Sequence, residues 1–530
     1  MPEDALIAER RRKVDELAAL GVAAYNVDFR PDTTLSEALA RLAAFEESSP
    51  PQPDGGPSAG PVVAVAGRIV QLRVMGRMVF AHIEDEEQRL QVWLRYERLG
   101  EDAWRMVELL DLGDIIGVRG PMARTRRGEP SVLADSVTLL VKALRPPPEK
   151  YHGLQEQETR LRKRYLDLLG NADQRLHFSR RTHIVAAVRR TLDSHRFLEV
   201  ETPILQAIPG GANARPFITH WNALHIDVYL RIAIELHLKR LLVGGYRRVY
   251  EIGRVFRNEG LSPRHNPEFT MLEAYEAYGD YRIMGLLTEE IIVAAANAVG
   301  PQAVADEAGG SPGSNPLARR YGGRELDLSP PFRSARMVDL VRETCGLDAM
   351  AAWDDGRLEE EARRLQVEVP AGAGPGVILM AIYEQLVEHT LWDPTFVLDY
   401  PAEVSPLARR RSDDPRFVER FELIVAGREL ANAFSELNDP IDQRRRFEQQ
   451  AGLRAAGDVE AHPLDEDFLE AIETGMPPAG GLGIGIDRLV MLLTDRASIR
   501  EVLLFPTMRP RHAAGTSGQL PDVGGEELEG

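Results

Sequence analysis

The sequence lacks several features that define whole classes of protein. It has a single cysteine, Cys345, in 530 residues, which excludes an intramolecular disulfide and an all-cysteine zinc site and fits a reducing cytoplasm. No apolar run approaches the roughly 18 residues that a membrane helix needs, and residues 1–13 are charged instead of resembling a signal peptide. From these absences we expect a cytoplasmic protein with no membrane span.

Positive charge is also in the minority. The chain has 64 Lys and Arg against 82 Asp and Glu, a formal net charge of −18, which argues against indiscriminate binding to nucleic acid. The charge does not exclude RNA, because affinity for phosphates depends on local basic patches. With 44% hydrophobic residues, a chain of this length can bury more than one core, so we expect two or three domains.

The N-terminal part begins with a helix and a connector. Residues 5–20 have the apolar spacing of a helix with a basic cluster at 10–13, and the simplest interpretation is a solvated amphipathic helix. The stretch SSPPQPDGGPSAGP at 48–61 is of low complexity and predicts a flexible connector. We therefore assign residues 1–61 to a basic helix and a connector.

Short alternating strands with turn signals between them follow the connector. Five strands and one helix-like interruption at 102–110 predict an OB-fold barrel over residues 62–146. This fold binds single-stranded nucleic acid by stacking bases on aromatic side chains. Three consecutive prolines at 146–148 predict a stiff, extended segment at the end of the barrel. We expect a charged linker helix within residues 147–176.

Residues 249–275 hold a crowded group of polar side chains. An alternating apolar run breaks at Asn-Glu-Gly and resumes at residue 268, which predicts an antiparallel hairpin. Charged residues interleave with aromatic ones along it, a pattern that an edge hairpin needing only solubility would not require. We expect part of the hairpin to face a pocket, with solvated charges or salt bridges as the alternative.

A glycine-rich stretch, GGLGIGIDR at residues 480–488, leads into a long apolar run. Glycines let a backbone approach a ligand closely, so we expect a loop that opens a buried helix with Arg488 in its first turn. The stretch lacks the Lys-Ser/Thr of a P-loop, and its late position argues against a dinucleotide-binding unit.

FRNEG and RHNPEF in one hairpin, together with GLGIGIDR near the end, resemble motifs 2 and 3 of the class II aminoacyl-tRNA synthetases. The surrounding sequence, from about residue 4 to 510, resembles the bacterial-type lysyl branch of that family. The resemblance implies an α+β multidomain protein in which the OB-fold β-barrel precedes a catalytic domain, residues 177–510, built on an antiparallel sheet flanked by helices. Inserted helices are expected at about 348–392, and an acidic, disordered tail at 511–530.

The resemblance also implies an activity and partners. The enzyme would activate L-lysine with ATP to lysyl-adenylate, release pyrophosphate, and transfer lysine to the 3′ end of tRNA(Lys). Motif 1, the helix and strand at 177–203, implies a homodimer. Because the family carries a basic helix at its N-terminus, contact with tRNA is the alternative for residues 5–20.

Residue roles follow from the same resemblance. Catalytic roles fall to Arg257 and Arg488, which would clamp the substrate carboxylate and the phosphates of ATP. The ATP-binding residues would be Arg257, Glu259, His265, Asn266, Phe269 and Arg488, and the lysine-binding residues Gly211, Glu235, Glu273, Tyr275, Asn432, Phe434 and Glu436. Phe80 and Gln91 would bind the anticodon, although an aromatic residue in such a barrel is often part of the core.

Two groups of carboxylates indicate chemistry by their own pattern. If a hairpin turns at 426–427, Glu422 and Glu429 fall close together, and two carboxylates suit Mg²⁺ held partly by ligand phosphates. Solvated strand charges are the alternative. Glu235 lies among apolar residues, where an unpaired charge is costly, so it needs a cationic partner. A salt bridge to Lys239 is its structural alternative.

Three other functions share part of this pattern. A synthetase for asparagine or aspartate would have motifs 2 and 3 but not the three glutamates at 235, 273 and 436. An enzyme that transfers an amino acid to a protein or lipid would lack the barrel or carry a membrane region. A non-catalytic paralogue would have lost Arg257, Arg488 or a metal-binding carboxylate, and all of these are present.

Overall fold

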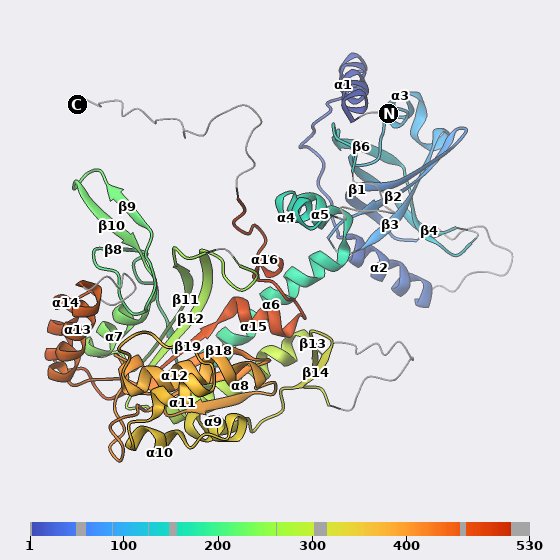
Figure 1. Ribbon diagram of the computed structural model, residues 1–530. Coiled ribbons are helices and arrows are strands. Elements are labelled where there is room, and N and C mark those ends of the chain that lie inside the picture. The colour runs from blue at the N-terminus through green and yellow to red at the C-terminus, as the bar shows by residue number, and fades with distance from the viewer. Residues whose placement is uncertain are drawn as a thin grey trace. The chain divides into compact units, whose positions relative to one another are not determined.

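The computed structural model describes residues 3–48, 60–86, 88–125, 127–147, 156–260, 262–300, 315–455 and 463–509. The chain divides into two units, Met1–Arg175 and Leu176–Gly530, called unit 1 and unit 2 below (Figure 1). Most of the connector predicted at 48–61 and all of the tail predicted at 511–530 lie outside the described residues.

Unit 1 is organised around a barrel of six strands. Strands β1, β2, β3, β5 and β4 form a closed ring, because β1 pairs with both β2 and β4. Strand β6 pairs with β4 in antiparallel orientation. The elements are α1 Glu3–Ala19, α2 Leu35–Ser48, β1 Val62–Met75, β2 Met78–Glu84, β3 Arg89–Arg95, α3 Tyr96–Val107, β4 Ile115–Arg124, β5 Pro130–Leu133, β6 Ser136–Val141, α4 Gln157–Arg162 and α5 Arg164–Gly170. The barrel predicted from the sequence is therefore present.

Two details of the barrel differ from the prediction. The segment 130–140, predicted as one strand, forms β5 and β6. At the break, the amide of Ala134 bonds to the carbonyl of Trp93, after which the chain leaves β3 and pairs with β4. Helix α3 begins at Tyr96, directly after β3, and is kinked at Gly100, where φ is 78°, so the helix expected at 102–110 corresponds to its second part, which ends at Val107.

Unit 2 is built on an eight-stranded sheet in the order β15-β16-β17-β18-β19-β12-β11-β7. Neighbouring strands are antiparallel except for β15–β16 and β11–β7 at the two edges. The strands of unit 2 are β7 Leu198–Glu199, β8 Leu205–Gln206, β9 Ile218–Trp221, β10 Ile226–Leu230, β11 Arg248–Phe256, β12 Glu268–Ala277, β13 Ala318–Tyr321, β14 Arg324–Asp327, β15 Arg333–Arg336, β16 Thr395–Leu398, β17 Arg420–Val425, β18 Arg428–Ser435 and β19 Ala479–Gly485. The predicted antiparallel sheet is confirmed, with a parallel pair at each edge.

Helices pack on this sheet and form two cores. The first core joins the sheet to α6, α8 and α15 through buried side chains such as Val188, Ile291 and Leu489. The second lies among α9 to α12 and strands β16 and β17, and includes Leu340, Tyr383 and Ile424, so these helices pack against the sheet. The helices are α6 Ala172–Ser194, α7 Glu235–Val243, α8 Tyr281–Val299, α9 Met337–Cys345, α10 Ala349–Asp354, α11 Leu358–Arg364, α12 Pro375–Leu386, η1 Glu388–Thr390, η2 Ala402–Val404, α13 Pro440–Ala455, α14 Glu466–Glu473, α15 Ile486–Leu493 and α16 Ile499–Val502. Among the helices of the described residues, none is both long and apolar enough to cross a membrane.

The centre of the sheet brings together segments that are far apart in the sequence. Strand β19 pairs with β12 on one side and β18 on the other (Figure 1). The hairpin predicted at 249–275 is confirmed as β11–β12. The turn predicted at 426–427 is also confirmed, and both of its residues have positive φ, 52° and 68°, as in the favoured two-residue hairpin turns.

The glycine-rich stretch at 480–485 differs from the prediction. We expected a loop, but these residues lie in β19, near the middle of the sheet, and helix α15 follows at Ile486. Two of the glycines are needed, because a Cβ atom at Gly481 would overlap Glu436 and the ring of Tyr275, and a Cβ atom at Gly480 would lie 2.7 Å from the carbonyl oxygen of Asp280.

Part of the basic cluster of α1 fixes this helix to the barrel. Arg10 is 7% exposed and donates to two barrel carbonyls at 2.7 and 2.9 Å. Lys13 pairs with Asp111 at 2.7 Å. The cluster is therefore not wholly solvated, because Arg11 and Arg12 are exposed while the other two basic residues hold the helix in place.

Asp111 also binds a fully buried lysine. The Nζ atom of Lys142 lies 2.6 Å from Asp111 and 2.7 Å from Asp114, and the side chains of Lys142 and Asp114 are both 0% exposed. Loss of one partner from such a group leaves uncompensated charge in the interior.

Replacement of Lys142 by Met should destabilise unit 1 by about 3–5 kcal/mol, because buried Asp114 loses its cation and Asp111 keeps only Lys13. Urea denaturation of the full chain, followed by circular dichroism, measures the loss as a lower transition midpoint. Arg105→Ala is the control, since its ion pair with Glu101 is 55% and 65% exposed and should contribute less than about 1 kcal/mol. Equal midpoints for the two variants would contradict the prediction.

Candidate active site

A cavity of about 320 Å³ opens at the centre of the sheet of unit 2. Its lining comes from the central strands, the first turn of α7 and the segment 404–408. It brings together nine of the residues predicted from the sequence: Gly211, Glu235, Arg257, Glu273, Tyr275, Glu422, Glu429, Asn432 and Phe434. The volume suits a small ligand with several polar groups.

Three glutamates lie close together in and beside this cavity. Glu235, Glu273 and Glu436 are 6%, 4% and 1% exposed. The Nζ atom of Lys239 lies 2.5 Å from Glu235 and also pairs with Glu436. Glu273 accepts a hydrogen bond from the hydroxyl of Tyr275 at 2.9 Å and one from a backbone amide just before α7 at 3.0 Å. Two of the three carboxylates thus share one ammonium group, and no other cation among the described residues forms an ion pair with any of the three.

The pKa values of this glutamate cluster reflect the shortage of positive charge. Burial, together with repulsion from Glu235, raises the pKa of Glu273 to about 7. Burial also holds the pKa of Glu436 well above its usual range, although Lys239 opposes the shift. Burial alone would lower the pKa of Lys239, but Glu235 and Glu436 together raise it. A bound cation would therefore stabilise the cluster.

Two glycines make room for the cluster. A Cβ atom at Gly481 in β19 would overlap a carboxylate oxygen of Glu436 and lie 2.6 Å from the ring of Tyr275. Gly211 has a φ of 87°, and a Cβ atom there would lie 2.9 Å from the Cβ atom of Ala233. A side chain at either position would displace the groups that form the cavity.

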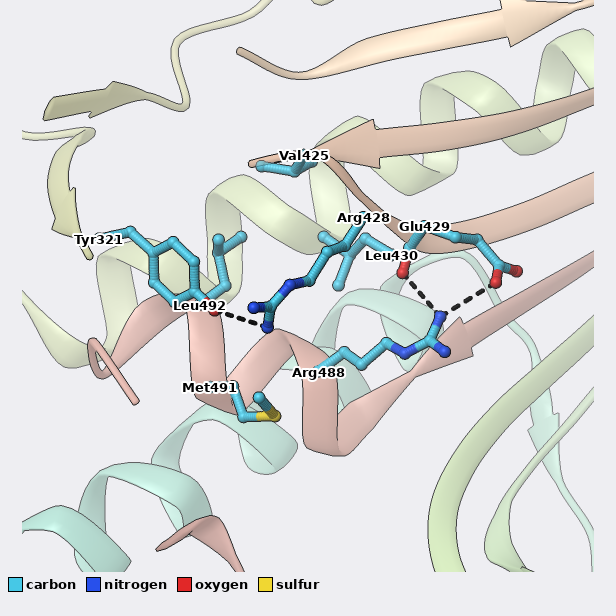
Figure 2. Close-up of a pocket in the computed structure, with 8 residues that line it drawn as sticks. All are labelled: Tyr321, Val425, Arg428, Glu429, Leu430, Arg488, Met491 and Leu492. Atoms are coloured by element: carbon cyan, nitrogen blue, oxygen red, sulfur yellow. Dashed lines mark hydrogen bonds and ion pairs between the residues drawn. The ribbon is translucent and has the colours of Figure 1, made fainter. Parts of the chain in front are cut away.

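Two further carboxylates line the same cavity, Glu422 on β17 and Glu429 on β18. Arg420 bonds to Glu422, and Arg488 donates to the carboxylate and the carbonyl of Glu429 at 3.0 and 2.8 Å (Figure 2). Burial, with a contribution from Glu429, raises the pKa of Glu422 to about 7. At Glu429 burial is outweighed by Arg488, so the pKa of that carboxyl is lowered.

A smaller pocket adjoins Glu429 (Figure 2). Arg428 donates to the hydroxyl of Tyr321 at 3.0 Å, and Arg488 points toward Glu429. Met491 from α15 contributes to the apolar part of the lining. With two guanidinium groups and one carboxylate, the pocket carries an excess of positive charge and suits an anion.

Arg257 follows β11 and lines the main cavity. Its guanidinium carbon lies 5.2 Å from the centre of the Phe269 ring. Its Nε atom makes a long hydrogen bond of 3.4 Å to the carbonyl of Ile232, and within the described residues no carboxylate forms an ion pair with it. The guanidinium group is therefore available for two-point binding of a carboxylate or phosphate.

Three other predicted residues of motif 2 lie in the turn between β11 and β12, outside the cavity lining, whereas Phe269 lies on β12. Glu259 and His265 are exposed, and a ring nitrogen of His265 lies 2.9 Å from the hydroxyl of Ser262. Asn266 is 4% exposed and donates to the carbonyl of Glu268, whereas its Oδ1 atom has no partner in the described part of the chain. The structure thus brings Arg257 to the cavity but not these three side chains.

In unit 1, the predicted anticodon residues lie on two neighbouring strands. Phe80 stacks on Trp93 with ring centres 5.4 Å apart. Gln91 is 7% exposed and donates to Glu129 at 2.9 Å, and His82 also bonds to Glu129, at 2.7 Å. An aromatic surface beside hydrogen-bonding groups can stack on a base and read its edge.

No functional role is predicted from the sequence for three residues of these sites, Lys239, Arg420 and Glu129. Lys239 is predicted only as a salt-bridge partner of Glu235, although a spacing of four residues in one helix places the two side chains together. Arg420 lies two residues before Glu422 on the same strand face, a signal that the alternation of a strand supplies. The contact between Glu129 and Gln91 joins residues 38 positions apart, and no local pattern predicts it.

The chain is similar to known proteins over nearly its whole length. Residues 156–509 match the family model of tRNA synthetases class II (D, K and N). The chain belongs to the class II tRNA synthetases. Residues 63–140 match the model of the OB-fold nucleic acid binding domain. Both the family and the barrel expected from the sequence are confirmed, and a synthetase of this class takes ATP, an amino acid and tRNA as substrates.

Relatives of this class II synthetase carry the name lysine–tRNA ligase. One from Moorella thermoacetica is 49% identical over 514 residues, 96% of this chain and 99% of that protein. One from Thermoanaerobacter sp. is 48% identical and covers 96% of both chains. One from Bacillus subtilis is 53% identical over 452 residues, 85% of this chain and 87% of that protein. The resemblance to the lysyl branch of the family is therefore confirmed.

Replacement of Gly481 by Ala should lower the thermal unfolding temperature of the synthetase. The new methyl group overlaps Glu436 and the ring of Tyr275, and overpacking of this kind typically costs ~1–3 kcal/mol. Gly483→Ala on the same strand is the matched control, since its nearest contact is the flexible end of Met271 at 3.3 Å. Calorimetry that found the same loss in both variants would refute the special role of Gly481.

Proposed function

We propose that this synthetase is a lysine–tRNA ligase, which activates L-lysine with ATP to lysyl-adenylate, releases pyrophosphate, and transfers the lysyl group to the 3′ end of tRNA(Lys). The observation that supports this most is the glutamate cluster, in which three carboxylates are buried and the ammonium group of Lys239 pairs with only two of them. L-Lysine carries two ammonium groups and supplies the positive charge that the cluster lacks.

The residues around the cavity suit the parts of a lysine molecule. Gly211 and Glu235 would bind the α-amino group, Glu273, Tyr275 and Glu436 the side-chain ammonium, and Asn432 the carboxylate, while Phe434 would pack against the aliphatic stem. An amino acid without a second ammonium group would leave buried carboxylates unpaired, a loss of several factors of ten in rate. This reasoning disfavours asparagine, and aspartate would add a further negative charge.

Activation needs positioning and charge neutralisation but no protein nucleophile. An oxygen of the lysine carboxylate attacks the α-phosphorus of ATP, and the bond from that phosphorus to pyrophosphate breaks in line with the attack. Arg257 would bind the α-phosphate and the substrate carboxylate, and Arg488 the γ-phosphate. Phe269 would stack on the adenine. Glu259, His265 and Asn266 lie in the turn that would read the adenine and position the triphosphate.

Glu422 and Glu429 would hold Mg²⁺. Both offer carboxylate oxygen atoms to the cavity, and such donors fit a hard divalent cation. No group of three or more His, Cys, Asp or Glu side chains that could hold a metal ion occurs in the described residues, so phosphate oxygens would complete the ligand set. The bound ion would neutralise phosphate charge.

We further propose that Phe80 and Gln91 bind the anticodon, by stacking and hydrogen bonding respectively. Large apolar side chains on β7, β8 and β9 support a homodimer, since Leu198, Leu205 and Ile218 are 48%, 50% and 62% exposed. Exposed apolar groups of this kind gather at protein–protein interfaces. The single cysteine and the substrates of translation fit a cytoplasmic enzyme.

ATP–pyrophosphate exchange by the purified protein, with magnesium and each of the twenty amino acids in turn, tests the proposed function. We expect exchange with lysine alone, because the glutamate cluster requires two ammonium groups. Exchange with asparagine or aspartate would keep the family but overturn the reading of Glu235, Glu273 and Glu436. Absence of exchange with every amino acid would indicate a non-catalytic paralogue.

The affinity for lysine should rise with pH. The pKa of Glu273 is raised to about 7 in the free enzyme, and its protonated form cannot pair with an ammonium group that stays charged to above pH 10. Lysine binding should therefore release a proton, and the KM for lysine should fall roughly fivefold from pH 6 to 7, roughly tenfold from pH 6 to 8, and level off above about pH 8. Exchange assays across this range measure it, and a pH-independent KM would contradict the assignment.

A further inference from the structure

Lys239 is the one cation that forms an ion pair with the glutamate cluster in the described part of the chain. It lies one turn after Glu235 in α7 and is 0% exposed. Its Nζ atom is 2.5 Å from Glu235, pairs with Glu436, and lies 5.5 Å from the centre of the Phe434 ring. All three of these partners belong to the proposed lysine-binding set.

These contacts join separate elements of the fold. Glu235 and Lys239 belong to α7, whereas Glu436 directly follows β18. Apart from the ion pair, neither carboxylate oxygen of Glu436 has a hydrogen-bond partner among the described residues. A buried carboxylate without a cation would take up a proton or force the local structure to open. Both the charge and the position of Glu436 therefore depend on Lys239.

The other groups that face the cluster cannot replace this ammonium group. Glu273 and Tyr275 face the ion pair from β12. Glu273 is a carboxyl group, and the hydroxyl of Tyr275 donates to Glu273. Gly481 packs against Glu436 from β19 and has no side chain. Arg257 lines the same cavity, but its contacts are with the ring of Phe269 and the carbonyl of Ile232, and among the described residues it forms no ion pair with the cluster.

We infer that Lys239 is a positioning residue for amino-acid recognition, whose ammonium group holds the carboxyl groups of Glu235 and Glu436 in place for the ammonium groups of the substrate. The inference rests on the proposed function. Lys239 does not contact the reacting atoms and acts through the two carboxylates. The salt bridge that the sequence offers as an alternative to a functional Glu235 is thus part of the same function.

Lys239→Met tests this inference, because it removes the ammonium group and largely keeps the shape of the side chain. The KM for lysine in ATP–pyrophosphate exchange should rise roughly 10–100-fold, the usual effect of removing a group that orients a ligand. The KM for ATP should change less than about twofold, since the ion pair does not involve the proposed ATP-binding residues.

Lys142→Met is the matched control. It too removes a fully buried lysine from between two carboxylates, but in unit 1 and away from the cavity lining. A purely structural effect of losing a buried ion pair would lower the stability of both variants, yet it would leave the KM for lysine unchanged in both. We expect a raised KM for lysine in Lys239→Met alone.

Lys239→Gln is the second variant, in case the methionine variant does not fold. Its amide can still donate hydrogen bonds to a carboxylate but carries no charge, and it should also raise the KM for lysine. An unchanged or lower KM for lysine in a folded variant would overturn the inference, and so would an equal rise in the KM of both substrates. Failure of the proposed function is seen separately, as exchange by the unsubstituted enzyme that does not depend on lysine.

Discussion

Burial of like charge is the constraint on which the cavity of unit 2 depends. A carboxylate removed from water must gain a cation, a proton or hydrogen bonds. Glu235 and Glu436 have the ammonium group of Lys239, and Glu273 has a hydroxyl and a backbone amide. These partners compensate for only part of the charge, and the cluster can therefore accept a further cationic group.

The same chemistry gives a different result in unit 1. Lys142 lies between Asp111 and Asp114, and further basic groups of α1 bind near these carboxylates, including Lys13 on Asp111. The two carboxylates there have two lysine partners, so their charge is compensated. This ion-pair network stabilises the barrel and does not need a further cation. A buried ion pair is thus structural or functional according to the balance of charges around it, and not according to the residue types.

The sheet holds these charges in place because its strands differ in the size of their side chains. Strand β19 is rich in glycine, and its neighbours β12 and β18 carry the large polar groups. Glu436 and Tyr275 pack directly over Gly481, so the space for the cluster is created by the absence of a side chain. Functional groups on adjacent strands of one sheet are also positioned more rigidly than groups on loops.

Local patterns in the sequence by themselves determined the motifs of the synthetase family, the barrel, the hairpin at 249–275 and the turn at 426–427. These features depend on residues that are neighbours in the chain, so alternation and turn signals suffice to predict them. Only the tertiary structure decided that residues 480–485 form a strand, because glycines suit both a loop near a ligand and a strand beneath large side chains. The tertiary structure also decided that Lys239 forms ion pairs with two glutamates from different elements. Compensation of charge depends on distance in space and not on distance along the chain.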